Sequence, residues 1–256
     1  MNKVLRDSIH SSLSVDGFST ALHISNEELD YIYQSIWNIF LYRLQLISPG
    51  HANRYLDSYK HLSSYHLSPE LTDLHAKIWS KEARVLSPLF VNWFKQSNFW
   101  QQLEKCFGPL SISDEDAYGW ENIYWRLVRP NMVNDVGPLH RDSWFWQLNS
   151  DFKKPEFPFK RIKIWIAVLT DPGLNGLIVV PGSHLDSNIQ WHGELRHGKC
   201  KPVLDSDPLK FNQELIPTQP GQCIIFDDNL LHGGAINRAP STRISLELTL
   251  IQPLIV

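Results

Sequence analysis

Cysteine is scarce in this chain, with only three among 256 residues, at Cys106, Cys200 and Cys223. The number is odd, and no two of them form a Cys-x-x-Cys pair. A disulfide framework is built from an even set of cysteines and a zinc ribbon from close pairs, so the sequence favours neither. We therefore expect a reducing environment and a cytoplasmic location.

Long apolar runs and an excess of basic charge are also missing. No stretch approaches the ~18 uncharged apolar residues of a membrane-spanning helix, and Met1 to Asp7 contain no continuous apolar segment. The formal net charge is −3 with Lys and Arg scattered, whereas nucleic-acid-binding domains carry clustered basic residues. We expect neither a membrane nor a nucleic-acid partner, and the oligomeric state stays open.

The remaining composition is that of an ordinary globular protein. Hydrophobic residues make up 43% of the chain and charged residues 20%, so a sizeable core is available. The length suits one large domain or two small ones, and all-β sandwiches and barrels often use this length as one unit. We expect a single domain over residues 1–256.

Helical signals dominate the N-terminal half. Ser25 and Glu28 form a capping box, and the apolar residues behind them recur at helical spacing, which predicts a helix that ends near Ile47. A second helix start is expected at 68–70, where Pro occupies the first helical position, and a further helix over 88–106. This half is expected to be mainly a helical support.

From about residue 119 the apolar pattern changes toward alternation, and β-branched and aromatic residues become frequent. The pattern predicts strands over 121–129, 137–143, 160–169, 176–180, 222–226, 231–237 and 243–251. Residues 119–256 are thus expected to form a β-rich core supported by residues 1–118. Within it, segment 185–220 mixes charge, His, Gly and Pro, which predicts an extended loop or lid over a pocket mouth.

His140 and Asp142 stand one residue apart, and His232 follows 90 positions after Asp142. Alternate residues of a strand point to the same face, so we expect His140 and Asp142 to be aimed at one ion. Two imidazoles and one carboxylate occupy three positions around Fe(II) and leave three open for a chelating cosubstrate and dioxygen. A His-x-Asp pair alone is weak evidence, because such pairs also occur in turns and surface clusters.

The surrounding motifs resemble the phytanoyl-CoA dioxygenase family of Fe(II)/2-oxoglutarate oxygenases. Trp165, the Asn175-Gly176 turn and the segment Pro181-Gly-Ser-His184 stand where members carry their signature between the first and last iron ligands. The family's distal histidine matches His232, and eleven residues later its 2-oxoglutarate-binding arginine matches Arg243. The resemblance covers roughly residues 120–251.

The resemblance implies a double-stranded β-helix, that is, a cupin-like jelly roll flanked by α-helices. It also implies Fe(II) held by His140, Asp142 and His232, with Arg243 binding the far carboxylate of 2-oxoglutarate. The implied reaction uses O2 to hydroxylate a C–H bond of a small metabolite or biosynthetic intermediate, and releases succinate and CO2. Because Asp142 is present, no ligand position is vacated for halide, which favours hydroxylation over halogenation. Gly234 departs from the family, whose members often carry Ser or Thr there.

The last predicted strand offers a structural test of this interpretation. Arg243, Ser245 and Glu247 share one face, and Ile244, Leu246, Leu248 and Leu250 share the other. A jelly-roll oxygenase turns the polar face inward toward the metal and packs the apolar face under the helices. An ordinary sandwich would turn the polar face outward, so the burial of Arg243 separates the two arrangements.

Five nearby residues carry weaker predictions. Trp165 lies where relatives place an aromatic near the cosubstrate, although a buried strand Trp is as often core. Trp144 and Trp146 are expected to share the face of Asp142 and line the substrate pocket, with a plain hydrophobic wall as the alternative. Arg126 stands where relatives contact cosubstrate or substrate, although a solvated face suits it better. His184 ends a strand in a Pro-Gly-Ser turn, which favours a structural role.

Two other classes of function remain open from the sequence. A metal-dependent cupin-type isomerase or binding protein would use the same jelly roll and ligands without 2-oxoglutarate. A non-enzymatic jelly-roll interaction module would not need Asp142 at all. The complete set of ligands together with Arg243 favours the oxygenase.

Overall fold

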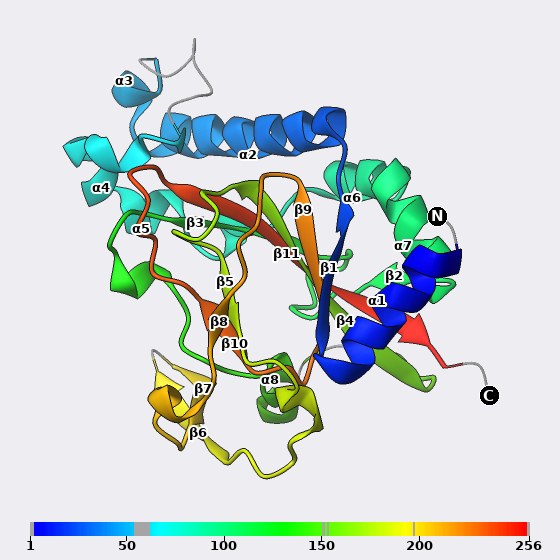
Figure 1. Ribbon diagram of the computed structural model, residues 1–256. Coiled ribbons are helices and arrows are strands. Elements are labelled where there is room, and N and C mark those ends of the chain that lie inside the picture. The colour runs from blue at the N-terminus through cyan, green and yellow to red at the C-terminus, as the bar shows by residue number, and fades with distance from the viewer. Residues whose placement is uncertain (1–2, 54–61, 150–151, 153, 197, 255–256) are drawn as a thin grey trace.

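The computed structural model describes residues 3–53, 62–149, 152, 154–196 and 198–254. Two antiparallel sheets face each other, and helices surround the larger one (Figure 1). This is the predicted jelly-roll sandwich with a largely helical N-terminal half. None of the described helices combines the length and apolar character needed to cross a membrane.

Helices occupy most of the first 107 residues. The described α-helices there are α1 (Lys3–Val15), α2 (Asn26–Ile47), α3 (Pro49–Ala52), α4 (Pro69–Asp73), α5 (His75–Ile78), α6 (Pro88–Phe94) and α7 (Asn98–Phe107). The capping box is confirmed, because Ser25 Oγ accepts from the Glu28 amide at 3.2 Å and Glu28 Oε2 accepts from the Ser25 amide at 3.0 Å. The prediction of a single helix over residues 88–106 is wrong. This segment divides into α6 and α7, because the Ser97 hydroxyl caps a new helix by accepting from the Trp100 amide at 3.0 Å.

The large sheet holds six strands in the order β1 (Phe18–His23), β9 (Gln222–Asp227), β4 (Phe159–Leu169), β11 (Arg243–Pro253) and β2 (Ser111–Ile112), with β3 (Ile123–Val128) also paired to β11. The small sheet has the order β10 (His232–Gly234), β5 (Leu177–Val179) and β8 (Glu214–Leu215). The sequence did not predict β1 or β2. The N-terminal half therefore contributes strands to the large sheet as well as helices.

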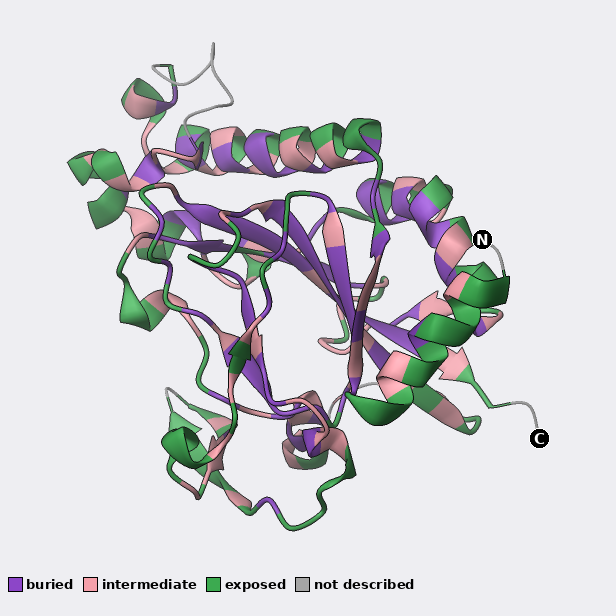
Figure 2. Cartoon of the chain, viewed as in Figure 1, coloured by how far each residue is buried: buried purple, intermediate pink, exposed green. Residues whose placement is uncertain are grey.

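Each face of the large sheet meets a different layer. Apolar side chains on the outer face of β4 and β11 form the main core with α2, α6 and α7. On the inner face, Trp165 and Ala167 pack against Leu177 and Val179 of the small sheet. Figure 2 shows the strands of the large sheet as mostly buried and the helices as exposed on their outer sides. The metal-ligating candidates lie on the inner side, between the two sheets.

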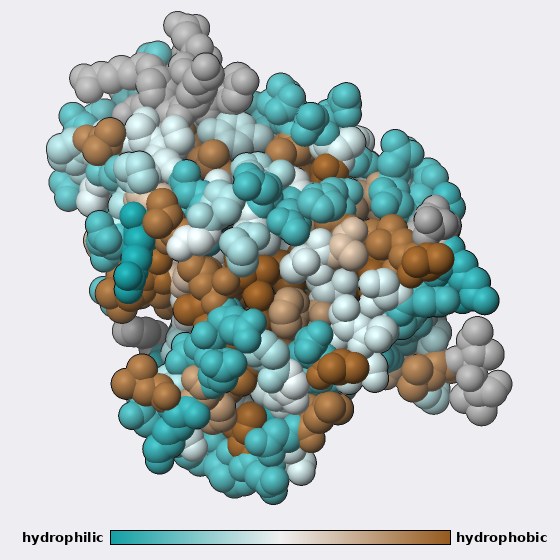
Figure 3. Space-filling view, viewed as in Figure 1, coloured by the Kyte–Doolittle hydropathy of each residue, from teal (hydrophilic) through white to brown (hydrophobic). Residues whose placement is uncertain are grey.

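Segment 185–220 is more ordered than the predicted loop. It forms a two-stranded ribbon of β6 (Trp191–Arg196) and β7 (Lys199–Leu204), and then leads into β8. The ribbon packs against α8 (Asp142–Leu148). In the space-filling view, polar side chains cover much of the ribbon, whereas apolar ones gather toward the middle of the same face (Figure 3). A lid function for this segment stays a prediction.

The predicted strand over 137–143 is wrong. His140 forms only an isolated bridge with His232, and Asp142 is the first residue of helix α8. The aromatic run after Asp142 favoured a strand by local propensity, but an acidic residue also suits the first turn of a helix, where it meets the positive end of the helix dipole. His140 and Asp142 therefore approach one another where the chain turns from the bridge at His140 into helix α8.

Candidate metal centre

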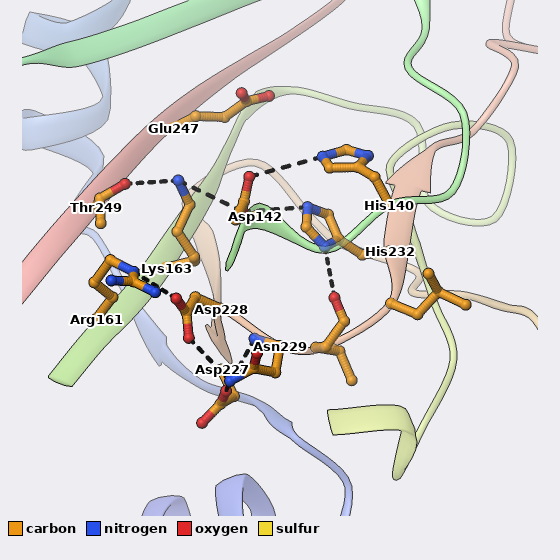
Figure 4. A network of polar contacts seen from close by, with 12 residues as sticks. His140, Asp142, Arg161, Lys163, Asp227, Asp228, Asn229, His232, Glu247 and Thr249 are labelled. Atoms are coloured by element: carbon orange, nitrogen blue, oxygen red, sulfur yellow. Dashed lines mark hydrogen bonds and ion pairs between the residues drawn. The ribbon is translucent and has the colours of Figure 1, made fainter. Parts of the chain in front are cut away.

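His140, Asp142 and His232 converge on one point. Their candidate ligand atoms all lie within 4.8 Å of one another. Asp142 Oδ1 lies 3.7 Å from His140 Nε2, and Asp142 Oδ2 lies 3.4 Å from His232 Nε2 (Figure 4). Reciprocal backbone hydrogen bonds between His140 and His232, at 2.8 and 2.9 Å, hold the two imidazoles side by side.

Both imidazoles are oriented by backbone carbonyls. His140 Nδ1 lies 2.8 Å from the Pro138 carbonyl, and His232 Nδ1 lies 2.9 Å from the Leu230 carbonyl. A ring that donates from Nδ1 to a carbonyl leaves the lone pair of Nε2 free for a metal. Both Nε2 atoms face Asp142, so the donor set is two imidazole nitrogens and one carboxylate. That set fits a divalent iron.

The protonation of the site suits metal binding. Burial is the main cause that lowers the pKa of His232 to about 4, with Asp142 acting in the opposite direction. Burial acts to raise the pKa of Asp142, but Lys163, His232 and His140 outweigh it and hold this pKa well below its ordinary value. At neutral pH, the site therefore presents a carboxylate and a neutral His232 without prior loss of a proton.

A lysine that sequence reasoning missed adjoins the centre. Lys163 Nζ, on β4, lies 3.5 Å from Asp142 Oδ2 and donates to Thr249 Oγ1 at 2.6 Å (Figure 4). Burial acts to lower the pKa of Lys163, but Asp142, Glu115 and Glu247 outweigh it and raise this pKa. The side chain is thus an ammonium. Strand alternation from Trp165 would have placed Lys163 on the inner face.

Arg243 is buried on the inner face of β11, with 3% of its surface exposed. This confirms the inward polar face that the sequence predicted for a jelly-roll oxygenase. Arg243 Nη1 donates to the Gly176 carbonyl at 2.8 Å, and its guanidinium lies 5.7 Å from the Trp165 ring. Burial lowers the pKa of Arg243 to about 10, so the side chain stays charged at neutral pH.

Three buried polar atoms beside Arg243 have no partner within the described part of the chain. They are Arg243 Nε, Trp165 Nε1 and Ser245 Oγ. Buried polar groups in proteins are nearly always paired, so a group of unpaired donors indicates a place for an acceptor. A carboxylate of 2-oxoglutarate fits this chemistry.

Gly234 has a steric explanation. A Cβ built at this position would lie 3.1 Å from Val136 Cβ and 3.3 Å from its Cγ1. The chain at Val136 occupies the space that the hydroxyl of a Ser or Thr would need. The unpaired Ser245 hydroxyl is a donor that this chain offers in the same region.

The predicted substrate-pocket tryptophans do not share a strand face with Asp142, because both lie on α8. Trp144 stacks on Trp191 of the ribbon, with centroids 5.1 Å apart and planes 13° apart. Trp146 lies under the Arg161 guanidinium at 4.8 Å. Both rings are buried in these contacts, and a role in lining the substrate pocket stays a prediction.

Phe145, which the sequence did not single out, is the aromatic of α8 that meets the centre. Its ring lies edge-on to His140 at 5.4 Å. Helical spacing from Asp142 would have indicated it, because residues three apart share a helix face.

Arg126 is half-exposed and donates from Nε to Glu247 Oε2 at 2.7 Å. His184 Nε2 donates to the Ser14 carbonyl at 3.3 Å, in agreement with the structural role favoured for it.

Comparison with known proteins identifies the family. Residues 60–245 match the family model described as phytanoyl-CoA dioxygenase. The chain belongs to this family. It is thus an Fe(II)- and 2-oxoglutarate-dependent dioxygenase, and the donor set of the centre agrees with that chemistry. A comparison with curated proteins finds no significant match.

Several solved structures share the fold. EvdO2 from Micromonospora carbonacea var. aurantiaca has a TM-score of 0.57 at 14% identity, over 99% of this chain and 91% of that one. EctD from S. alaskensis, solved with 2-oxoglutarate and 5-hydroxyectoine, has a TM-score of 0.56 at 16% identity, over 98% and 76%. The epimerase SnoN, in complex with Fe3+, alpha-ketoglutarate and nogalamycin RO, has a TM-score of 0.52 at 15% identity, over 98% and 85%. Identities this low establish the fold and no more.

Proposed function

We infer that this dioxygenase hydroxylates a C–H bond of a small polar metabolite or biosynthetic intermediate, and converts 2-oxoglutarate into succinate and CO2. One observation carries this proposal. The three ligand side chains converge beside the same inner face on which Arg243 is buried with unpaired donors around it. A metal-binding jelly roll without 2-oxoglutarate would have no use for that second group.

Each residue has a role in this proposal. His140, Asp142 and His232 hold iron, which when bound activates dioxygen at the expense of 2-oxoglutarate. Arg243 binds the far carboxylate, and its planar, permanently charged guanidinium suits a two-pronged contact. Trp165 Nε1 and Ser245 Oγ are further unpaired polar groups beside Arg243.

The charges beside the centre support a substrate of little net charge. Arg126 is paired with Glu247, and Lys163 lies near Asp142 and Glu115. Iron together with Asp142 and one cosubstrate carboxylate has no net charge, and the other carboxylate is neutralised by Arg243. The charged side chains around the centre are thus balanced, which supports a small substrate of little net charge. EctD and SnoN, which were solved with small organic ligands, are similar examples.

The test is an anaerobic titration of the Fe(II)-loaded protein with 2-oxoglutarate. The expected result is the visible charge-transfer band of a chelated 2-oxo acid, which Asp142→Ala abolishes. Arg243→Ala should keep iron but need more 2-oxoglutarate. A protein that binds iron and gives no band would instead support a cupin-type isomerase or binding protein. Succinate release then provides the assay for substrates.

A further inference from the structure

The proposed function gives Lys163 no role in binding metal or cosubstrate, although its ammonium lies beside Asp142. It projects from β4 into the inner face with 11% of its side chain exposed. Removing an ammonium from water is costly unless the charge is paired. The carboxylate that it meets, Asp142 at 3.5 Å, is one of the three metal-ligating side chains.

The ammonium has a second anchor that does not involve Asp142. Lys163 Nζ donates to Thr249 Oγ1 at 2.6 Å, and the Thr249 hydroxyl donates to Glu115 Oε2 at 3.0 Å. These residues come from β4, β11 and the loop after β2, so three separate segments fix the charge. Glu247, also on β11, adds a second negative charge that stabilises the ammonium. The anchor therefore holds Lys163 in place independently of Asp142.

A fixed positive charge at this position has two effects of opposite sign. It repels a divalent cation at the centre and competes with that cation for Asp142. It attracts the anions that bind beside the cation, among them the carboxylate and keto oxygens of a chelating 2-oxo acid. Both effects are large, because charges a few ångströms apart inside a protein are poorly screened.

We propose that Lys163 is a positioning residue that lowers the affinity of the centre for metal and raises its affinity for the 2-oxo acid, acting through Asp142 and the anchor on Thr249. The inference rests on the proposed function, which assigns His140, Asp142 and His232 to the metal. It adds a residue that lies outside the ligand set and outside the group of unpaired polar atoms beside Arg243. It also explains why a lysine is kept in a buried position.

Lys163→Met tests the proposal, because it keeps most of the side chain and removes the charge. Metal affinity is measured on the full chain by anaerobic competition of Fe(II), and separately of Co(II), against a coloured chelator. Cosubstrate affinity is measured from the charge-transfer band with 2-oxoglutarate. The expected result is a metal Kd about tenfold lower and a 2-oxoglutarate Kd about tenfold higher, the scale on which partners of metal ligands act. Lys163→Arg, which keeps the charge, should restore both constants toward native values.

Lys160→Met is the matched control. Lys160 lies on the same strand, is 48% exposed and pairs with Asp227 at 3.0 Å, so its loss should change neither constant. If Lys163→Met weakens both ligands, the lysine is only structural, and if it changes neither, the charge does not act on the centre; either result overturns the proposal. Thermal melting of the metal-free protein shows whether the variant folds, and Lys163→Gln takes its place if it does not. A native chain that gives no band overturns the proposed function instead.

Discussion

Neighbouring residues of β11 face two different surroundings. Ile244, Leu246, Leu248 and Leu250 are at most 1% exposed and pack under the helices in the main core. Arg243 and Ser245 are buried almost as deeply, at 3% and 0%, but carry polar atoms without partners. Arg243 and Ser245 are therefore buried about as deeply as the apolar residues, but they carry unpaired polar atoms, whereas the named outer-face side chains have no polar atoms. The outer face stabilises the fold, and the inner face keeps binding groups available.

The largest effect on stability is expected from the outer face. Leu246→Ala removes a fully buried side chain and leaves a cavity, which should cost about 2–5 kcal/mol of unfolding free energy. Denaturant unfolding measures this loss, and the 2-oxoglutarate affinity of the folded fraction should stay native. If Leu246→Ala weakened cosubstrate binding without loss of stability, the two faces of β11 would not have separate roles.

Arg243→Leu should weaken 2-oxoglutarate binding and leave the stability of the fold intact, which is the opposite of the result expected for Leu246→Ala. The loss of a charge-assisted contact to a buried carboxylate should cost about 2–5 kcal/mol of 2-oxoglutarate binding. Iron affinity should be retained, because Arg243 is not among the three ligating side chains. Unfolding free energy should be unchanged or higher, since a buried charge with an unpaired Nε is removed. A clear fall in stability together with native cosubstrate affinity would show that Arg243 is structural.

A third prediction concerns pH and a cluster outside the centre. Burial and Arg129 lower the pKa of His75 from 6.5 to about 4, against the opposing effect of Asp135 at 3.9 Å. Between these two pH values the unfolded chain binds the proton more tightly than the folded chain. Unfolding free energy should therefore fall as pH drops from 6.5 to about 4, by at most about 3 kcal/mol. Denaturant unfolding across this range measures the loss.

His75→Gln is the control for this pH dependence, because the glutamine side chain is neutral throughout. Its unfolding free energy should therefore fall less than that of the native chain between pH 6.5 and about 4. Burial acts to raise the pKa of Asp135, but hydrogen bonds from Arg129 outweigh it and hold this pKa below 3.8. The stability that Asp135 contributes is thus lost only in more acid solution, as pH falls through that lowered pKa. A native-like slope between pH 6.5 and 4 in His75→Gln would assign the effect to other groups.

The sequence predicted those parts of the molecule that depend on local signals. The Ser25 cap and the alternation along β11 each have a local physical cause, and both are confirmed. The corner between His140 and Asp142 was predicted wrongly, because it depends on the pairing of His140 with His232, 92 residues away. Local propensity cannot report such a contact.

The same limit applies to the residues that surround the centre. Trp144 packs on Trp191 of the ribbon, and Lys163 is anchored through Thr249 to Glu115. These contacts join segments that are far apart in the sequence, so spacing within one segment does not reveal them. The roles of the site residues, the single domain and the cytoplasmic location stay predictions.

The smallest expected effect belongs to Gly234, on the small sheet that faces β11. Gly234→Ser forces a Cβ to 3.1 Å from Val136, which should cost about 1 kcal/mol of unfolding free energy. Val136→Gly in the same chain removes both crowding atoms, Cβ and Cγ1, so the double variant should lose less stability than the two single variants together. The added hydroxyl should leave 2-oxoglutarate affinity at or above the native value, measured from the charge-transfer band. If the single substitution costs nothing, the neighbouring segment moves aside readily, and crowding by Val136 does not explain the glycine.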